Sequence, residues 1–509
     1  MEKEGEMRKK SAILNILTSI FFQLVTLVCG LIVPRLIIGA YGSEVNGFAN
    51  TITQFLAFIT LLQAGVGPVV KSMLYREIAK KDQNRINGIM KSAELFFRGI
   101  GLISVGYIIV LCIFLPNTVG DKFDIFFSVT LIIAVSISTI AEYLFGITYM
   151  IFLQAVQKSY IVHLLSTFTK LASTIVVIIM VHFDCSIVLV KAISSLIFII
   201  KPIMQYLYVR RRYNVETGSN IERIKIKQKW DGLAQHVAYT IHQNTDVIVL
   251  SLFSTLSNVS IYGVYNMITT EIKSLITAFS GGLEAGFGDI IAKKERKKLL
   301  SSFSKYESFY MTLVSIIYPC TLLLITPFVS VYTIGVTDAN YIQGEFGVLI
   351  TIAAMVYAIR QPYNSIVLAA GHFKQTKRGA IVEALVNIVL SVILVWKFGL
   401  VGVAIGTLVA MLIRSIEFIY HTNKHILRRS IFESVKKIFI VVIDTILIAL
   451  IVHFIPMLEM NSYLHWIMYA IEVFAVALVV VLPFNYLLYK DDFRDLKRMM
   501  KMVARRKQD

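Results

Sequence analysis

The stretch from Ser11 to Gly39 reads SAILNILTSIFFQLVTLVCGLIVPRLIIG and carries a single charged side chain, Arg35. An α-helix needs about 20 predominantly apolar residues to cross a hydrocarbon core about 30 Å thick. The run exceeds that length, it is much too long for the apolar core of a secretory signal, and no small-residue cleavage site follows it. It therefore predicts a first transmembrane helix that is retained in the protein.

Similar runs recur along all 509 residues, of which 56% are hydrophobic and 16% charged, with a mean hydropathy of +0.71. A soluble protein carries about 25% charged residues, and outer-membrane strands alternate in polarity over about 10 residues. Neither class fits, so an all-α polytopic membrane protein is predicted. Its fourteen transmembrane helices are expected near residues 11–39, 46–74, 92–115, 124–151, 161–182, 187–209, 231–253, 260–290, 306–333, 345–370, 379–396, 400–422, 438–456 and 464–489.

The net charge of +18 follows the predicted topology. Most of the 50 Lys and Arg residues lie in alternate connections, at both ends and in loops such as 210–229 and 293–298, whereas the opposite connections hold only Lys122 and Lys397. Lys and Arg beside a span resist translocation. Both termini are therefore expected in the cytoplasm. The spread of these charges disfavours a nucleic-acid partner, and some of them are expected to contact anionic membrane lipids.

An internal repeat predicts two lobes. Residues 45–50 read VNGFAN and residues 261–266 read IYGVYN, and the motif AGVG at 64–67 recurs as AGFG at 285–288. The repeat unit is six spans. Because six is even, both copies enter the membrane in the same direction, which favours two parallel six-helix lobes around a central cavity.

The domain organisation follows from this repeat. We predict an N-lobe over 1–209, a cytoplasmic linker over 210–230, a C-lobe over 231–422, and two additional helices with a basic cytoplasmic tail over 423–509. No polar stretch is long enough for an extramembrane domain, and no nucleophile, metal-ligand cluster or nucleotide motif occurs. An enzyme, an ATP-driven pump and a bound cofactor are therefore not predicted. The scattered cysteines fit neither disulfides nor a zinc site and are interpreted as small apolar residues: Cys29, Cys112, Cys185 and Cys320.

The first predicted span ends in Pro34-Arg35-Leu36, followed by Gly39-Ala40-Tyr41-Gly42. With the parallel repeat and the two additional helices, this ending resembles the Wzx-type lipid-linked oligosaccharide flippases of the multidrug, oligosaccharidyl-lipid and polysaccharide exporter superfamily. The resemblance covers essentially the whole chain.

The resemblance implies alternating-access transport of an undecaprenyl-pyrophosphate-linked repeat unit across the bacterial cytoplasmic membrane, for capsule, exopolysaccharide or O-antigen synthesis. Glycosyltransferases and a polysaccharide polymerase are the implied protein partners. A cation-coupled multidrug exporter of the same superfamily, or a flippase for another lipid-linked cell-wall precursor, is the alternative within transport. A membrane enzyme or an assembly scaffold is the alternative of another class, disfavoured by the missing extramembrane domain.

Charged side chains inside the predicted spans are the candidate site residues. Each costs about 2.5 to 3.5 kcal/mol at a helix centre on insertion scales, so each should face a wet cavity or a partner. We interpret Lys71, Arg98 and Lys191 as snorkelling to the headgroups, and the pairs Glu94–Arg98 and Arg414–Glu417 as ion pairs on one helix face. The substrate-binding candidates, for which buried structural pairing stays open, are Arg35, Lys170, Lys273 and Arg360.

A candidate ion-coupling pair lies in the seventh predicted span. His242 and Asp246 are four residues apart and share one helix face, and Glu271 lies close to Lys273 in the eighth span. A carboxylate beside a group that titrates near neutral pH suits coupling to H⁺ or Na⁺. A polar pair that only packs two helices together is the alternative.

Overall fold

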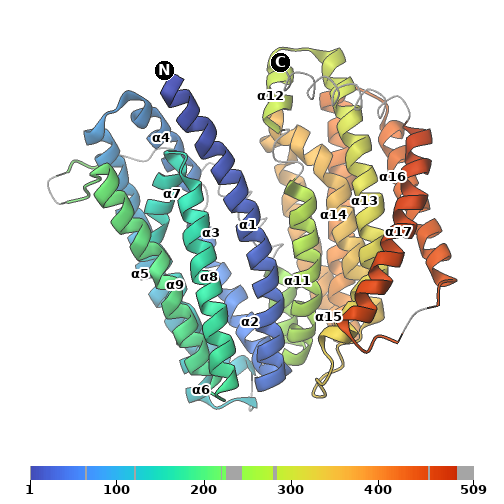
Figure 1. Ribbon diagram of the computed structural model, residues 1–509, viewed down its shortest axis with the longest axis horizontal. Coiled ribbons are helices and arrows are strands. Elements are labelled where there is room, and N and C mark those ends of the chain that lie inside the picture. The colour runs from blue at the N-terminus through green and yellow to red at the C-terminus, as the bar shows by residue number, and fades with distance from the viewer. Residues whose placement is uncertain are drawn as a thin grey trace. The chain divides into compact units, whose positions relative to one another are not determined.

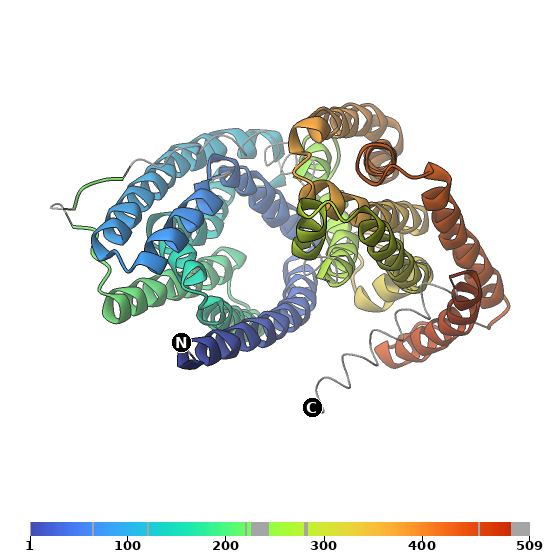
Figure 2. The ribbon, with the colours of Figure 1, turned by 90° about the horizontal axis from the view of Figure 1, so that it is seen from above.

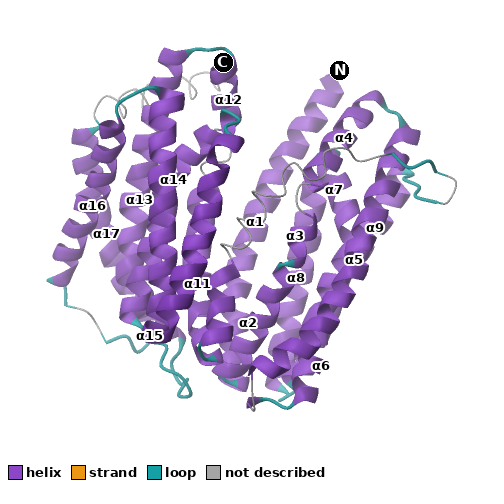
Figure 3. Ribbon diagram, turned by 180° about the vertical axis from the view of Figure 1, so that it is seen from behind, coloured by secondary structure: helices purple, strands orange, loops and turns teal. Residues whose placement is uncertain are grey.

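A computed structural model describes residues 2–63, 66–119, 122–218, 221–224, 244–278, 284–456 and 459–489. Every regular element in these ranges is a helix (Figures 1 and 3). Ten segments, including the long element α15, are apolar and long enough to cross a membrane. The all-helical prediction is thereby confirmed, whereas the number of fourteen spans and the layout of the repeat stay predictions.

The chain forms two compact units, here unit 1 (Met1–Ser260) and unit 2 (Ile261–Asp509). The predicted lobe boundaries stay a prediction. Unit 1 contains α1 (Glu2–Tyr41), α2 (Ser43–Ala57), α3 (Ile59–Gln63), α4 (Val66–Lys80), α5 (Gln83–Val119), α6 (Ile125–Ala141), the π-helical turn η2 (Glu142–Gly146), α7 (Ile147–Ala155), α8 (Ser159–His182), α9 (Ile187–Tyr213), and a short helix Asn244–Phe253.

Two predicted spans of unit 1 are interrupted helices. The span expected over 46–74 is broken by a turn at Phe58 between α2 and α3, and the span over 124–151 contains the turn η2 between α6 and α7. Gly42 separates α1 from α2 with a φ of 86°, a left-handed value that glycine adopts without steric cost. This position lies within the glycine-rich motif that ends the first predicted span.

The helices of unit 1 pack around a continuous apolar core. α1 packs along α8, α8 along α9, and α9 along α6, and Figure 2 shows the helices from above. Phe48, Phe97 and Phe152 are fully buried in this core. The apolar part of α1, in contrast, is only 11% buried. Apolar side chains exposed on this scale are typical of a surface that faces lipid.

Unit 2 contains the C-terminal part of α11 and all later helices. Their bounds are α11 (Leu256–Ala278), α12 (Glu284–Ala292), α13 (Arg296–Tyr332), α14 (Gly344–Ala369), α15 (Phe373–His421), the π-helical turn η3 (Thr422–Leu427), α16 (Ile431–His453) and α17 (Tyr463–Leu488). α14 is the most enclosed of the apolar helices, with 78% of its apolar window buried. It packs against α12, α13 and α15.

The element α15 consists of two helices that meet at Gly399. Gly399 has a φ of 53° and a ψ of −126°, which is not helical and is accessible to glycine. The position agrees with the gap predicted between 396 and 400. A Cβ on Gly402 would lie 2.3 Å from the carbonyl oxygen of Leu394, and one on Gly406 would lie 2.5 Å from Ser391 Oγ. The two halves therefore approach each other through the small-residue spacing GxxxG.

The predicted orientation can be tested by cysteine labelling in intact cells. We expect single cysteines placed in 293–298 to be reached only after the membrane is permeabilised, and cysteines in 334–344 to be labelled from outside. The charge asymmetry of the connections is the physical reason. Labelling of 293–298 in sealed cells would overturn this topology.

Candidate functional site

Four charged residues of α14 and α15 form a buried ion cluster in unit 2. Arg360 of α14 donates to Glu383 Oε1 at 2.6 Å. Arg414 pairs with Glu417 at 2.5 Å and with Glu383 at 3.6 Å. These four residues, the α14–α15 ion cluster, carry two positive and two negative charges. The predicted pair Arg414–Glu417 is confirmed, and Arg360 has the carboxylate partner that the structural interpretation required.

Close packing keeps this cluster in one arrangement. Arg414 Nη1 also donates to the carbonyl oxygen of Thr376 at 2.7 Å, and its guanidinium lies 4.2 Å from the ring centroid of Phe418. A Cβ on Gly379 would lie 1.5 Å from Glu417 Oε2. Only glycine therefore fits beside the ion pair, which indicates a structural role for most of the cluster.

Lys273 extends the cluster towards α11. The ring of Tyr357 lies 5.7 Å from Lys273 Nζ and 4.8 Å from the Arg360 guanidinium carbon. Cations are attracted to the face of an aromatic ring. Lys273 is half-buried, as is Glu271, one turn or less away on the same helix. Two of the predicted substrate-binding cations are thus brought together around one tyrosine.

A pair of lysines lies inside the spans of unit 1. Lys170 of α8 and Lys191 of α9 are both half-buried, and they are close enough to repel each other electrostatically. Among the described residues, neither has a hydrogen-bond acceptor or a carboxylate partner. By comparison, Lys201 on the same α9 is neutralised by Glu142 at 3.0 Å. We call Lys170 and Lys191 the lysine pair.

Hydroxyl groups and a histidine continue the polar face around the lysine pair. Ser173 Oγ and Ser194 Oγ are 2.7 Å apart, and each lies three residues from one of the two lysines. His163, two helical turns before Lys170, contacts the ring of Phe22 on α1 at a centroid distance of 6.1 Å. The polar face of α8 therefore extends along its contacts with both α1 and α9.

The remaining predicted site residues lie in several places. Arg35 is half-buried near the C-terminal end of α1, and a Cβ on Gly39 would lie 3.4 Å from its Nη1 atom. Asp246 is 5% exposed in the helix Asn244–Phe253. His242 lies outside the described residues. Arg35, Lys170 and Asp246 belong to unit 1, whereas Glu271, Lys273 and Arg360 belong to unit 2.

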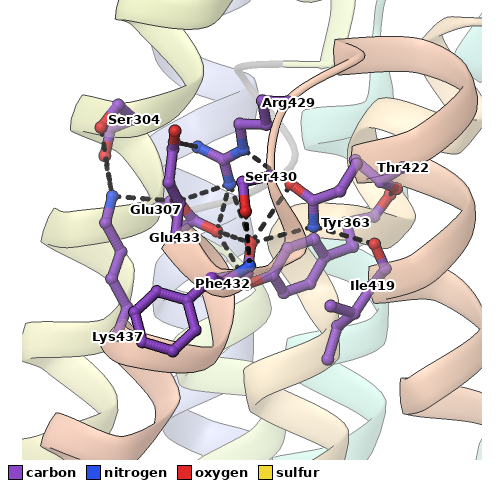
Figure 4. A network of polar contacts seen from close by, with 12 residues as sticks. Ser304, Glu307, Tyr363, Ile419, Thr422, Arg429, Ser430, Phe432, Glu433 and Lys437 are labelled. Carbon is purple, nitrogen blue, oxygen red and sulfur yellow. Dashed lines mark hydrogen bonds and ion pairs between the residues drawn. The ribbon is translucent and has the colours of Figure 1, made fainter.

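A second buried network in unit 2 was not predicted. Glu307 of α13 is fully buried and accepts hydrogen bonds from Arg429 at 2.7 and 2.8 Å, and from Tyr363 at 2.7 Å (Figure 4). Lys437 Nζ forms an ion pair with Glu307 Oε2 at 2.9 Å. This Glu307 network therefore joins α13, α14 and α16.

The same network fixes the turn between α15 and α16. Arg429 Nε donates to Asn423 Oδ1 in η3 at 2.6 Å, and Ser434 Oγ bridges Asn423 and Glu307. Arg428, beside it, has a φ of 51°, a conformation that costs non-glycine residues free energy. The network offsets that cost and anchors the start of α16 (Figure 4).

One sequence signal could have located Glu307. The pairs Lys80-Lys81 and Lys293-Lys294 align at a constant offset, and the same offset places Glu94 on Glu307. Glu94 pairs with Arg98 at 2.5 Å, as predicted. Lys191 was assigned to the headgroups because it is near a helix end, and only the packing of α8 on α9 brings it to Lys170.

The ion-paired networks of unit 2 and the lysine pair of unit 1 differ in what they can bind. The α14–α15 ion cluster and the Glu307 network satisfy their charges internally. The lysine pair presents two ammonium groups that have no acceptor among the residues that the structure describes, and such donors suit phosphate or diphosphate oxygens. No group of three or more His, Cys, Asp or Glu side chains in the described ranges could hold a metal ion.

Comparison with known proteins shows the fold. No protein family model matches the sequence, and no curated protein matches it. A structure of the lipid II flippase MurJ in an inward closed conformation is similar with a TM-score of 0.67 and 17% identity, covering 94% of this chain and 99% of that chain.

Solved structures of MOP superfamily transporters are also similar. An inward-facing multidrug resistance MATE family transporter of the MOP superfamily has a TM-score of 0.62 and 14% identity, covering 81% of this chain and 98% of that one. A MOP superfamily transporter from Pyrococcus furiosus has a TM-score of 0.57 and 11% identity, covering 82% and 95%. The chain thus has a fold shared by flippases and transporters.

Proposed function

We propose that this protein is a flippase that moves undecaprenyl-pyrophosphate-linked oligosaccharide repeat units from the inner to the outer leaflet of the bacterial cytoplasmic membrane. The two lobes alternate access to a central cavity, and the product feeds capsule, exopolysaccharide or O-antigen synthesis. The lysine pair is the observation that carries the proposal. The shared fold with the MurJ flippase supports it at the level of architecture.

The lysine pair places two positive charges inside membrane-spanning helices. A charge inside a membrane-spanning helix is costly unless it has a partner or faces water. Other basic residues inside the spans, such as Arg98, Lys201 and Arg414, have carboxylate partners. The ammonium groups of Lys170 and Lys191 are close enough to repel each other and have no carboxylate partner in the described ranges, so they create a positive potential. A lipid-linked diphosphate supplies the negative charge that relieves it.

The alternatives within transport are a MATE-like cation-coupled multidrug exporter and a flippase for another lipid-linked cell-wall precursor. The fold supports each of them equally well. The lysine pair disfavours cationic drugs, because it would repel them. It does not discriminate among lipid-linked diphosphates, since these differ in the sugar and share the charged group.

Depletion of the protein in its host distinguishes the candidate substrates. We expect loss of one surface polysaccharide, with its lipid-linked repeat unit accumulating at the inner leaflet. Sensitivity to cationic drugs should stay unchanged. Lysis with accumulated cell-wall precursor would instead indicate a lipid II flippase, and altered drug sensitivity with normal polysaccharide would indicate an exporter. Glycosyltransferases and a polymerase are the proposed partners, alongside membrane lipids.

We also propose that transport is coupled to H⁺ or Na⁺ through Asp246, with His242 and Glu271 as further candidates. Asp246 is a carboxylate buried in the short helix Asn244–Phe253. We expect Asp246→Asn to give an inserted, stable protein whose transport in vesicles is reduced and no longer responds to an imposed ion gradient. An amide cannot release and regain a charge in each cycle. Unchanged, gradient-dependent transport by this variant would remove the coupling role.

A further inference from the structure

A single carboxylate is buried between the two helices that lie outside the repeat and the core of unit 2. Asp444 is near the middle of α16, and its side chain is 0% exposed. Asn485 Nδ2 of α17 donates to Asp444 Oδ2 at 3.1 Å. Among the described residues, no basic side chain pairs with this carboxylate. Asp444 is therefore a buried acid whose neighbour is neutral.

Three oxygen atoms at this position have no hydrogen-bond partner within the part of the chain that the structure describes. They are Asp444 Oδ1, Asn485 Oδ1 and Ser315 Oγ. Asn485 is 1% exposed and Ser315 is 0% exposed, and the Ser315 hydroxyl of α13 lies beside the carboxylate without hydrogen-bond geometry. Polar side chains of α13 and α17 thus surround one buried carboxylate of α16, and each of the three residues has an oxygen without a partner among the described residues.

The apolar residues around Asp444 make a negative charge at this position energetically costly. The seam between α13, α16 and α17 is an apolar cluster that includes Ile316, Ile448, Val473 and Val481. A buried carboxylate in such surroundings is stable only when a cation or a proton neutralises it. In the same unit, Arg429 and Lys437 neutralise the charge of Glu307. No Arg or Lys in the described ranges neutralises Asp444 in this way.

We propose that Asp444, Asn485 and Ser315 form a binding site for a sodium ion. Hard cations in proteins are bound by carboxylate, amide and hydroxyl oxygens, and these are the three donors present. One carboxylate balances one positive charge, so a monovalent ion leaves the apolar seam neutral, whereas a divalent ion does not. The ion joins α16 and α17 to α13, and thereby holds the two additional helices on unit 2.

Sodium binding at Asp444 requires neither the proposed function nor the proposed coupling role of Asp246. It predicts that the stability of the protein depends on sodium. Full-length protein in detergent should unfold at a higher temperature in NaCl than in choline chloride of the same ionic strength, with a saturable dependence on Na⁺. The measurement is made in the Asp246→Asn background, so that sodium bound at the proposed coupling site does not contribute.

Variants locate the effect. We expect Asp444→Asn to abolish the sodium-dependent rise, and Ser315→Ala to shift its midpoint about tenfold towards higher Na⁺, the size of effect seen when a supporting ligand group is lost. Glu472→Gln is the matched control, because it removes an exposed carboxylate from α17 and should keep the response. Binding of radioactive sodium, expected at one ion per chain, should fall in parallel.

Several outcomes would overturn the site. Stability that rises on acidification and ignores Na⁺ would show that Asp444 is simply protonated. An equal response to NaCl and choline chloride would show an ionic-strength effect. If Asp444→Asn does not fold, the Ser315→Ala variant tests the site instead. An unchanged midpoint of its sodium-dependent rise in unfolding temperature would contradict the proposal.

Discussion

Replacing Glu307 by Gln is expected to lower the free energy of unfolding by about 3 to 5 kcal/mol, the range for removing one partner of a buried ion pair. The variant leaves Arg429 and Lys437, whose side chains are 6% and 10% exposed, without their carboxylate. The amide also cannot accept the hydrogen bonds of Arg429, Tyr363 and Ser434 together. Thermal and denaturant unfolding of the purified protein in detergent measures the loss.

The matched control lies on the same network. Glu433 also pairs with Arg429, at 3.4 Å, but its side chain is 56% exposed. Glu433→Gln should therefore change stability by about 0.5 kcal/mol or less, because solvent screens an exposed pair. Equal stabilities of the Glu307 and Glu433 variants would contradict the assignment of the network as the anchor of α16.

The second large effect concerns transport rather than stability. We expect Lys170→Ala with Lys191→Ala to reduce polysaccharide export by roughly a hundredfold or more, because charge-assisted hydrogen bonds contribute about 1.5 to 3 kcal/mol each. The protein should remain abundant, since removing two mutually repelling charges relieves repulsion between α8 and α9. Export of polymer and protein abundance are measured in the same cells.

Two comparisons make that result interpretable. Lys170→Arg with Lys191→Arg keeps both charges and should retain most of the export. Lys71→Ala removes a half-buried basic residue of α4, whose ammonium group lies 5.9 Å from the ring centroid of Tyr75, and should leave export unchanged. Normal export by the double alanine variant would reduce the lysine pair to a structural feature.

Much of the fold could be predicted from hydropathy and glycine positions. Length and apolarity locate a helix, because the backbone in a bilayer must satisfy its own hydrogen bonds. The boundary at Gly399 could be predicted in this way. The turn at Phe58 between α2 and α3 could not, since apolarity is similar on both sides of it.

The candidate site was less accessible to sequence reasoning. Pairs three or four residues apart, such as Glu94–Arg98, could be predicted because they share one helix face. Pairs between helices could not, because the sequence does not specify which faces pack together. Arg360 of α14 forms an ion pair with Glu383 of α15. Lys191 lies close enough to Lys170 for electrostatic repulsion only because α9 packs on α8. A single charge in a span is therefore ambiguous until its neighbours are known.

The most direct test of the account is flipping by the purified protein in sealed vesicles. One set of vesicles contains a fluorescent polyprenyl-diphosphate oligosaccharide, and a second contains a neutral polyprenol carrying the same sugar. The account predicts rapid, protein-dependent exposure of the diphosphate lipid, little movement of the neutral one, and loss of the difference in the Lys170→Ala, Lys191→Ala variant. Equal rates for both lipids, or a diphosphate rate that ignores the two lysines, would contradict it.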